Sequence, residues 1–197
     1  DDAEQLIGYS GESCAATMRR LGFDPDRIPE ARRDDIEAFI ELHIEQGPIL
    51  EQQGLPVGIV SIINGSHGYN VTVTGVANHA GARPMDMRQD PMVAAAEMIL
   101  AVNRNALAMG RPAVSTVGRI NVEPNLSPII PEKVMFSIDC RHNDPTQLAA
   151  LAGAHEAALH EIAARHGVQV TWSQRPPLLP VPCDPDIVRI LEDAAQE

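Results

Sequence analysis

Two of the four Asp-Pro pairs in this sequence, those at residues 90–91 and 144–145, constrain the fold of this chain more than any other feature. Such a pair is typical of a helix start, because the carboxylate accepts hydrogen bonds from free backbone N–H groups and proline suits the first helical position. An alanine-rich segment without an internal breaker follows each pair, the first to about Met109 and the second to about His166, where Gly167 ends it. We therefore predict two long helices.

Segments with the residue pattern of strands lie before, between and after these helices. The clearest runs from Lys133 to Arg141, where every second residue is apolar. Segments rich in β-branched residues also run from Tyr69 to Ala77, from Ala113 to Val122 and from Val168 to Ser173. The order is therefore βαββαβ. This order predicts a mixed α/β protein whose βαββαβ unit has a ferredoxin-like α+β fold, with both helices on one face of the sheet.

The βαββαβ unit spans residues 64–174, and the segments on either side do not close a domain of their own. Residues 1–63 offer a short helix near Ser13 to Leu21 and a strand at Val57 to Ile63, and residues 175–197 begin with a proline-rich linker. We expect the unit to be inserted into a second domain, of which this chain contains only a part.

Composition disfavours several classes of function. The 27 acidic and 15 basic residues give a formal charge of −12, which repels nucleic acids and anionic membrane surfaces. No apolar run approaches the roughly 20 residues that span a bilayer, and the first residues lack the pattern of a signal peptide. We expect a cytoplasmic protein without a nucleic-acid or membrane partner. Its three cysteines, Cys14, Cys140 and Cys183, form no CxxC pair and are expected to be reduced.

The sequence ELHIEQG, from Glu41 to Gly47, contains the first candidate site residue, His43. Its apolar residues fit one face of a strand and also the stripe of a helix, so periodicity does not distinguish the two. Zinc takes three or four ligands, and no second histidine lies at a metal-motif spacing from His43. On these residues alone, His43 is either a metal ligand or a hydrogen-bonded structural histidine, and structural histidines are the commoner case.

Three further candidates lie in or beside the βαββαβ unit. His79, in the turn sequence NHAGARP, is either a catalytic group held by the preceding strand or a residue that caps a turn. Arg141 ends a strand and either binds a carboxylate with its planar guanidinium or pairs with Asp139. Asn125, in VEPNLSP, contacts a polar ligand or caps a turn. The second helix carries three histidines that we expect to be solvated: His155, His160 and His166.

Four motifs in this order and at these separations resemble one enzyme family: LHIEQGPILE, GVANHAGARPMDMRQD, VEPN and FSIDCRH. The family is the amidohydrolase branch of the dinuclear-metal aminoacylase and carboxypeptidase superfamily. This branch includes N-carbamoyl-L-amino-acid hydrolases, ureidopropionase and allantoate amidohydrolase. The resemblance covers essentially the whole chain, and the IDCRH motif is most similar to that of allantoate amidohydrolase.

The resemblance implies a catalytic domain that binds two Zn or Mn ions, with an inserted βαββαβ lid that forms the contact of a homodimer. It implies that His43 binds one metal, which selects the strand for ELHIEQG, and that Gln46 contacts the substrate. It further implies that His79 reaches the active site of the neighbouring subunit and polarises the scissile carbonyl. Arg141 would bind the carboxylate of a small-molecule substrate.

One loop departs from the family pattern. The family has a substrate-binding asparagine thirteen residues before the arginine, and this chain has Pro128 there, with Glu132 in place of a glycine. Proline offers neither a side-chain amide nor a backbone N–H, so it does not replace that asparagine. Asn125 replaces it only if the loop moves. We expect either a different substrate or impaired activity.

The family's other metal ligands have no counterpart in this sequence: an upstream histidine, bridging aspartate and glutamate, and a downstream histidine in an SGAGHD-like motif. We therefore expect the chain to be a fragment whose metal site is incomplete or absent and which has no activity alone. The leading hypothesis is an amidohydrolase acting on a carbamoyl or ureido C–N bond in a small carboxylate. The alternatives are a non-catalytic dimerisation module and a related aminoacylase or dipeptidase.

Overall fold

The protein is described by a computed structural model, which covers residues 3–8 and 10–196. It divides into two compact units, residues 1–49 and 50–197. The first unit contains α1 (Cys14–Arg20) and a 3-10 helix, η1 (Pro25–Ala31). Ser13 caps α1 by accepting the Ala16 N–H, as the helix predicted for this segment requires.

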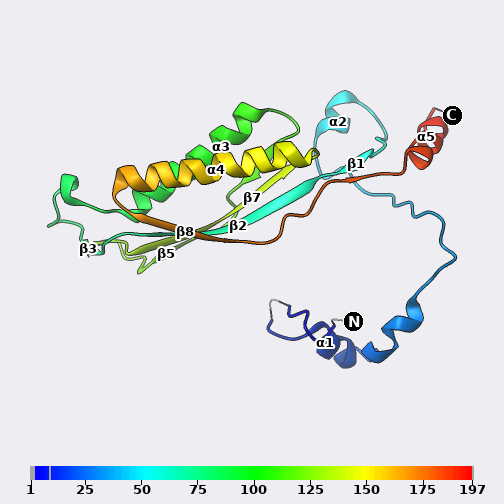
Figure 1. The fold of residues 1–197 in the computed structure, drawn as a ribbon, viewed down its shortest axis with the longest axis horizontal. Coiled ribbons are helices and arrows are strands. Elements are labelled where there is room, and N and C mark those ends of the chain that lie inside the picture. Colours follow the sequence, from blue (N-terminus) through cyan, green and yellow to red (C-terminus); the bar gives the residue numbers. More distant parts are fainter. Residues whose placement is uncertain (1–2, 9, 197) are drawn as a thin grey trace. The chain divides into compact units, whose positions relative to one another are not determined.

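The second unit contains a sheet with the predicted ferredoxin-like topology (Figure 1). Its two central strands, β2 (Gly65–Thr74) and β7 (Lys133–His142), are antiparallel and pair over their whole length. β8 (Gln169–Gln174) pairs with the other side of β2. β4 (Val114–Thr116) and β5 (Ile120–Glu123) pair one after the other with the free side of β7. This places β8 at one edge of the sheet and β4 and β5 at the other.

Two long helices, α3 (Pro91–Met109) and α4 (Pro145–His166), lie side by side on one face of this sheet (Figure 1). Their starts are those predicted, because the carboxylates of Asp90 and Asp144 each accept two backbone N–H groups of the first turn. Gly167, with φ 63°, ends α4 in the left-handed conformation that glycine adopts without strain.

The core lies between these helices and the sheet. The apolar positions of β7 are buried as predicted, and alternate residues of β2 join them. Each large side chain buried here is worth roughly 1.5–3 kcal/mol of transfer free energy. The sheet contributes Tyr69, Val71, Val73, Val134, Phe136, Ile138 and Cys140. Within the described residues, α3 alone is long and apolar enough to cross a membrane by length and composition, but its buried side packs in this core.

The remaining elements are short. β1 (Ile62–Ile63) pairs with β9 (Val181–Pro182), so the segments that lead into and out of the sheet lie side by side. β3 (Asn78–His79) pairs with β6 (Ile129–Ile130). The short helices are α2 (Ile49–Gln53), η2 (Met85–Met87) and α5 (Pro185–Ala194), the last capped by Asp184.

Two strand predictions were too long. Of the segment from Val57 to Ile63, only the last two residues are a strand, because only these pair with β9. The segment from Ala113 to Val122 is broken into β4 and β5, because the chain leaves regular pairing with β7 between them. There the Arg119 carbonyl accepts a single bond from the Ser137 N–H.

His155, which was expected to be solvated, is 1% exposed. Its Nδ1 lies 3.2 Å from the Asn105 amide nitrogen on α3, and its Nε2 lies 2.8 Å from the Ser115 hydroxyl on β4. Burial lowers the pKa of His155 to about 4, so the ring is neutral at pH 7. His160 is exposed as expected, whereas His166 is half-buried.

Candidate active site

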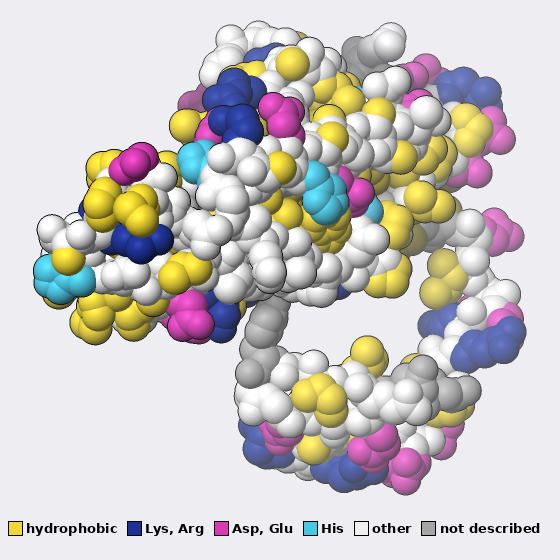
Figure 2. Space-filling model, turned by 60° about the vertical axis from the view of Figure 1, so that its left-hand side comes forward, with side chains coloured by type: hydrophobic (Ala, Val, Ile, Leu, Met, Phe, Trp, Pro, Cys, Tyr) yellow, Lys and Arg dark blue, Asp and Glu magenta, His cyan; other side chains and the backbone are white. Residues whose placement is uncertain are grey.

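β3, which carries His79, lies beyond the end of β2 at one end of the sheet (Figure 1). His79 is opposite Ile129 in β6, and the Ala80 N–H donates to the Pro128 carbonyl at 2.9 Å. The two candidate loops NHAGARP and VEPNLSP are therefore adjacent. Figure 2 shows hydrophobic, basic and histidine side chains exposed together at this end of the second unit.

The imidazole of His79 is held by its own turn. Its Nδ1 accepts the Gly81 N–H at 3.0 Å, and its backbone N–H donates to the Asn78 side-chain oxygen at 3.0 Å. Because Nδ1 is an acceptor, a neutral ring carries its proton on Nε2, and the exposed side chain can donate that N–H to a ligand. A Cβ added to Gly81 would lie 3.1 Å from the His79 ring, so the ring would have to shift by a few tenths of an ångström to admit a larger residue.

Two arginines that the sequence analysis did not select brace this loop. Arg88 donates from Nη2 to the Ala80 carbonyl at 2.6 Å and from Nε to the Arg83 carbonyl at 3.1 Å. Arg83 in turn donates to the Met87 carbonyl at 2.9 Å. Charge-assisted bonds of this kind are stronger than neutral ones, so they fix the backbone on which His79 stands. The one sequence feature that could have identified these two arginines is the ARPMDMRQD stretch, which contains both.

Asn125 borders a cavity of about 300 Å³ beside the His79 loop, and Ala80 and Arg88 line the same cavity. Its φ of 58° is left-handed, a conformation that asparagine tolerates better than most residues. Pro128 contributes only its carbonyl to the contact with Ala80. We refer to the residues that the structure brings together here as the tip site: His79, Gly81, Arg88, Asn125 and Pro128.

Arg141 lies at the other end of the sheet, opposite Ser66 at the start of β2. Its side chain is on the open face, the side of the sheet away from α3 and α4, because its neighbours in β7 alternate with buried residues. Its Nε and Nη2 donate to the two Asp139 carboxylate oxygens at 2.7 and 3.3 Å, which raises the pKa of the guanidinium. Arginine has five N–H donors, so Asp139 orients the group and leaves others for a ligand.

The separation of the tip site from Arg141 follows from the strand register. Ser66 faces Arg141, and Thr74 faces Lys133 at the far end of β7. At about 3.3 Å per residue these two rows are roughly 26 Å apart, and His79 lies beyond the second. A small carboxylate therefore cannot contact His79 and Arg141 of the same chain at once.

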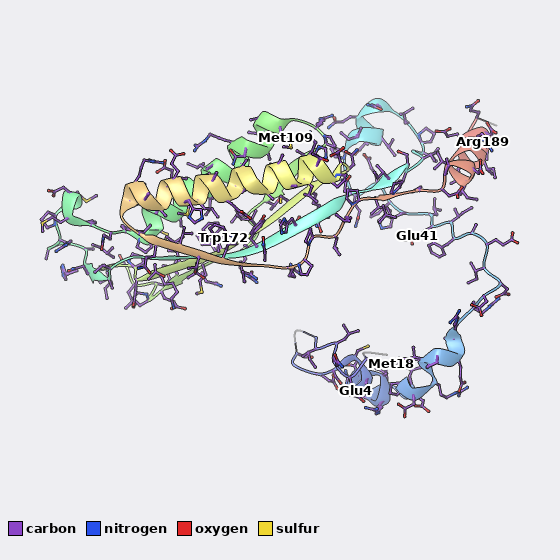
Figure 3. All side chains as sticks on the ribbon, viewed as in Figure 1. Glu4, Met18, Glu41, Met109, Trp172 and Arg189 are labelled. Atoms are coloured by element: carbon purple, nitrogen blue, oxygen red, sulfur yellow. The ribbon has the colours of Figure 1, made fainter. Side chains whose placement is uncertain are left out.

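His43 and Gln46 lie in the first unit, on a segment that is neither helix nor strand. Figure 3 shows this extended segment around Glu41. The predicted strand for ELHIEQG is wrong here, because a strand needs a neighbour for its backbone groups and residues 36–45 pair with no described strand. Leu42 is consequently 97% exposed. Nδ1 of His43 contacts the Ile44 carbonyl, and Gln46 has a φ of 54°.

Metal binding finds little support in the residues present. Within residues 3–8 and 10–196, no three His, Cys, Asp or Glu side chains gather as a metal site would require. His43 is therefore a single ligand where zinc takes three or four. The described side chains do not form a metal site by themselves, and the metal role of His43 stays a prediction.

Residues 63–167 match the peptidase dimerisation domain family, M20_dimer. N-carbamoyl-L-amino acid amidohydrolase of Geobacillus stearothermophilus is 39% identical, and allantoate amidohydrolase of Escherichia coli (strain K12) is 34% identical; each alignment covers 100% of this chain and 48% of the relative. A solved amidase of the hydantoinase/carbamoylase family from Burkholderia multivorans superposes with a TM-score of 0.83 at 34% identity, covering 95% of this chain and 45% of that one.

The chain spans about half the length of the curated relatives that it matches. The matched family segment covers the unit from β2 through α4, including both long helices, and ends before β8. It also includes the tip site and Arg141, two of the positions on which the resemblance rested. The chain therefore belongs to the peptidase dimerisation domain family.

Proposed function

We propose that this chain forms the lid and part of the active site of an amidohydrolase that cleaves a carbamoyl or ureido C–N bond in a small carboxylate. The names of its relatives support this reaction, with an N-carbamoyl-L-amino acid or allantoate as substrate. The observation that carries the proposal is the His79 turn, in which the Gly81 N–H occupies Nδ1 and leaves the Nε2–H to point outward.

In this proposal His79 donates its Nε2–H to the carbonyl oxygen as negative charge develops on it. A single donor of this kind, held in place before the reaction, is worth about 3 kcal/mol of transition-state stabilisation. Arg141 binds the substrate carboxylate with the donors that Asp139 leaves free. Asn125 borders the cavity next to His79 and is the amide available to a substrate at the tip site, while Gln46 stays a predicted substrate contact.

The end of β2 that faces Arg141 is roughly 26 Å from the far end of the strand. This separation supports an active site shared between two subunits. His79 of one subunit would act on the substrate that Arg141 of the other subunit holds. The family's name as a dimerisation domain also supports a homodimer. In a symmetric dimer each subunit gives its tip site to its neighbour, so two equivalent sites form.

The contact surface that we propose for this dimer is the outer side of α3 with the edge formed by β4 and β5. Val93, Leu100 and Leu107 follow one another at helical spacing on the exposed side of α3. Within the described residues β4 and β5 have β7 as their one strand neighbour, so their outer backbone groups are free to pair. An exposed apolar helix face beside an open strand edge suits a second copy of the same unit.

The proposed enzyme uses two divalent ions, Zn or Mn, and His43 would supply one imidazole ligand. Residues 1–63 and 175–197 would belong to the catalytic domain, with residues 64–174 inserted between them. The pairing of β1 with β9 supports this arrangement, because it places side by side the segment that enters the inserted unit and the segment that leaves it. A cytoplasmic location agrees with relatives that are metabolic enzymes.

The test is an assay of the full-length enzyme loaded with Zn or Mn. Release of ammonia and CO2 from N-carbamoyl-L-amino acids or allantoate is expected, with no cleavage of N-acetyl amino acids. Arg141→Ala should raise KM strongly for carboxylate substrates, because it removes the carboxylate's partner. An unchanged KM would remove Arg141 from the site, and cleavage of acyl or peptide amides alone would favour an aminoacylase or dipeptidase.

A non-catalytic dimerisation module is the second candidate, and Pro128 is the observation that favours it. The amide that the family uses at this position is absent, although the carbonyl still contacts Ala80. Pro128→Asn separates the two candidates. An amidohydrolase that this proline impairs should gain kcat/KM with the substitution, whereas a non-catalytic module gains nothing.

A further inference from the structure

A cleft of about 440 Å³ lies on the open face of the sheet, next to Arg141. It is bounded by β2, β7 and the chain after β8, which continues along β2 through three backbone bonds, one of them from the Ser66 N–H to the Leu178 carbonyl at 2.9 Å. The Arg175 N–H donates to the Gly68 carbonyl at 3.2 Å, and the Leu178 N–H donates to the Ser66 carbonyl at 2.9 Å. The cleft is lined by Ser66, Gly68, Asp139, Arg175, Pro176 and Leu178.

The side chain of Arg175 lies across β2, over Gly68. The position that a Cβ of Gly68 would take is 3.4 Å from Nη2 of Arg175, an ordinary van der Waals contact, so the guanidinium lies directly beside this glycine. Asp139 is the residue of β7 opposite Gly68. The guanidinium of Arg175 therefore lies over β2. Asp139 and Arg141 are on β7, which pairs with the other side of β2.

The charges around this cleft do not balance. Asp139 is the one carboxylate that lines it, and both oxygens of Asp139 are bonded to Arg141. Arg175 has no ion-pair partner in the part of the chain that the structure describes. On the same face Arg119 bonds to the amide oxygen of Asn70 instead of a carboxylate. This face is thus locally cationic, although the whole chain has a formal charge of −12.

We propose that Arg175 determines substrate specificity by binding a second carboxylate, so that the preferred substrate is an N-carbamoyl amino acid with an acidic side chain. This inference rests on the proposed function, in which Arg141 binds the first carboxylate. The Arg141 row and the Arg175 row are two residues apart along β2, about 7 Å, which an aspartate- or glutamate-sized dicarboxylate can span. Ser66, in the Arg141 row, supplies a hydroxyl, and Asp139 accepts from the carbamoyl N–H groups.

The test measures binding without turnover, on the chain itself. The ¹⁵N-labelled protein is titrated with N-carbamoyl-L-aspartate, N-carbamoyl-L-glutamate and N-carbamoyl-L-alanine while the arginine Nε–Hε signals are followed. We expect the signals of Arg141 and Arg175 to shift with the two dicarboxylates, which should bind about tenfold more tightly than the alanine compound.

Arg175→Gln should abolish this preference and keep the Arg141 response, and Arg175→Lys should retain part of the preference as a point charge. Arg189→Gln, at an exposed arginine on α5, is the matched control and should change nothing.

Equal affinity for all three compounds, or a preference that survives Arg175→Gln, would overturn the assignment. Selective binding by the chain combined with an inactive full-length enzyme would instead refute the proposed function and leave the dicarboxylate site standing.

Discussion

His79 and Arg141 lie at opposite ends of the same pair of strands, β2 and β7, roughly 26 Å or more apart. Both strands are in the core of the unit and pair along their whole length, so no local rearrangement brings the two side chains together. If both residues act on one small substrate, they act from different chains. The fold itself therefore makes the proposed chemistry depend on the dimer.

Mixing two inactive variants tests this dependence. At a substrate concentration near the wild-type KM, His79→Ala and Arg141→Ala, each in the full-length enzyme, should be inactive or nearly so as homodimers. A mixed dimer has one active site with both residues intact and one with neither, so equal mixing should recover about a quarter of the wild-type activity. Recovery should follow subunit exchange, and an assay taken before exchange is the control. No recovery after exchange would place both residues of a site in one chain.

Gly81→Ala tests the orientation of His79 without removing its imidazole. The added methyl group would lie 3.1 Å from the ring and shift it by a few tenths of an ångström relative to the Gly81 N–H, which changes the direction of its Nε2–H. We expect kcat to fall by about tenfold to a hundredfold with little change in KM, because the donor acts mainly in the transition state. Gly153→Ala, on the exposed side of α4, is the matched control, since a Cβ there meets nothing within 4 Å. An unchanged kcat in a variant of unchanged stability would contradict the role of His79.

Leu100→Glu tests the proposed dimer surface on the chain itself. Leu100 is 59% exposed and Leu107 is 73% exposed on the same side of α3. A carboxylate in the middle of a buried apolar contact loses its hydration without gaining a partner, so the dimer should dissociate. Light scattering across a concentration series should show a dimer for the wild type and a monomer for the variant. Leu21→Glu, at a leucine that is 60% exposed at the end of α1, should remain dimeric.

The parts of this fold that could be predicted are those set by near neighbours in sequence. Asp90 and Asp144 cap their helices through bonds that span two or three residues, and Gly167 ends α4 by its own φ. The alternation in β7 is similarly local. ELHIEQG could not be predicted in this way, because its conformation depends on a partner strand that its own residues do not specify.

The candidate sites show the same division. His79 and Arg141 stand in recognisable motifs, whereas Arg175 gains its position from a backbone bond to Gly68, more than a hundred residues earlier. His155 was misjudged for a related reason. It lies four residues before the buried Leu159 and so on the same side of α4, but its burial depends on polar partners from α3 and β4. Those partners are visible only once the elements are packed.

The buried position of His155 has a consequence for stability at acid pH. Its pKa is about 4 in the folded chain against an ordinary value of 6.5, because burial disfavours the charged ring. Between these two pH values the unfolded chain binds a proton that the folded chain does not. The contribution of neutral His155 is therefore complete above about pH 6.5 and is lost progressively as the pH falls toward 4.

Denaturant unfolding at pH 7 and pH 5 measures this contribution. His155 alone should lower the free energy of unfolding by about 2 kcal/mol between these two pH values, at about 1.4 kcal/mol per pH unit below 6.5. His155→Gln keeps polar groups near Asn105 and Ser115 but does not titrate. The free energy of unfolding of this variant should therefore fall by about 2 kcal/mol less than that of the wild type between pH 7 and pH 5. His160→Gln removes an exposed histidine and should behave as the wild type. Equal pH dependence in all three proteins would mean that His155 takes up its proton in the folded chain, and that its contacts with Asn105 and Ser115 do not hold it neutral.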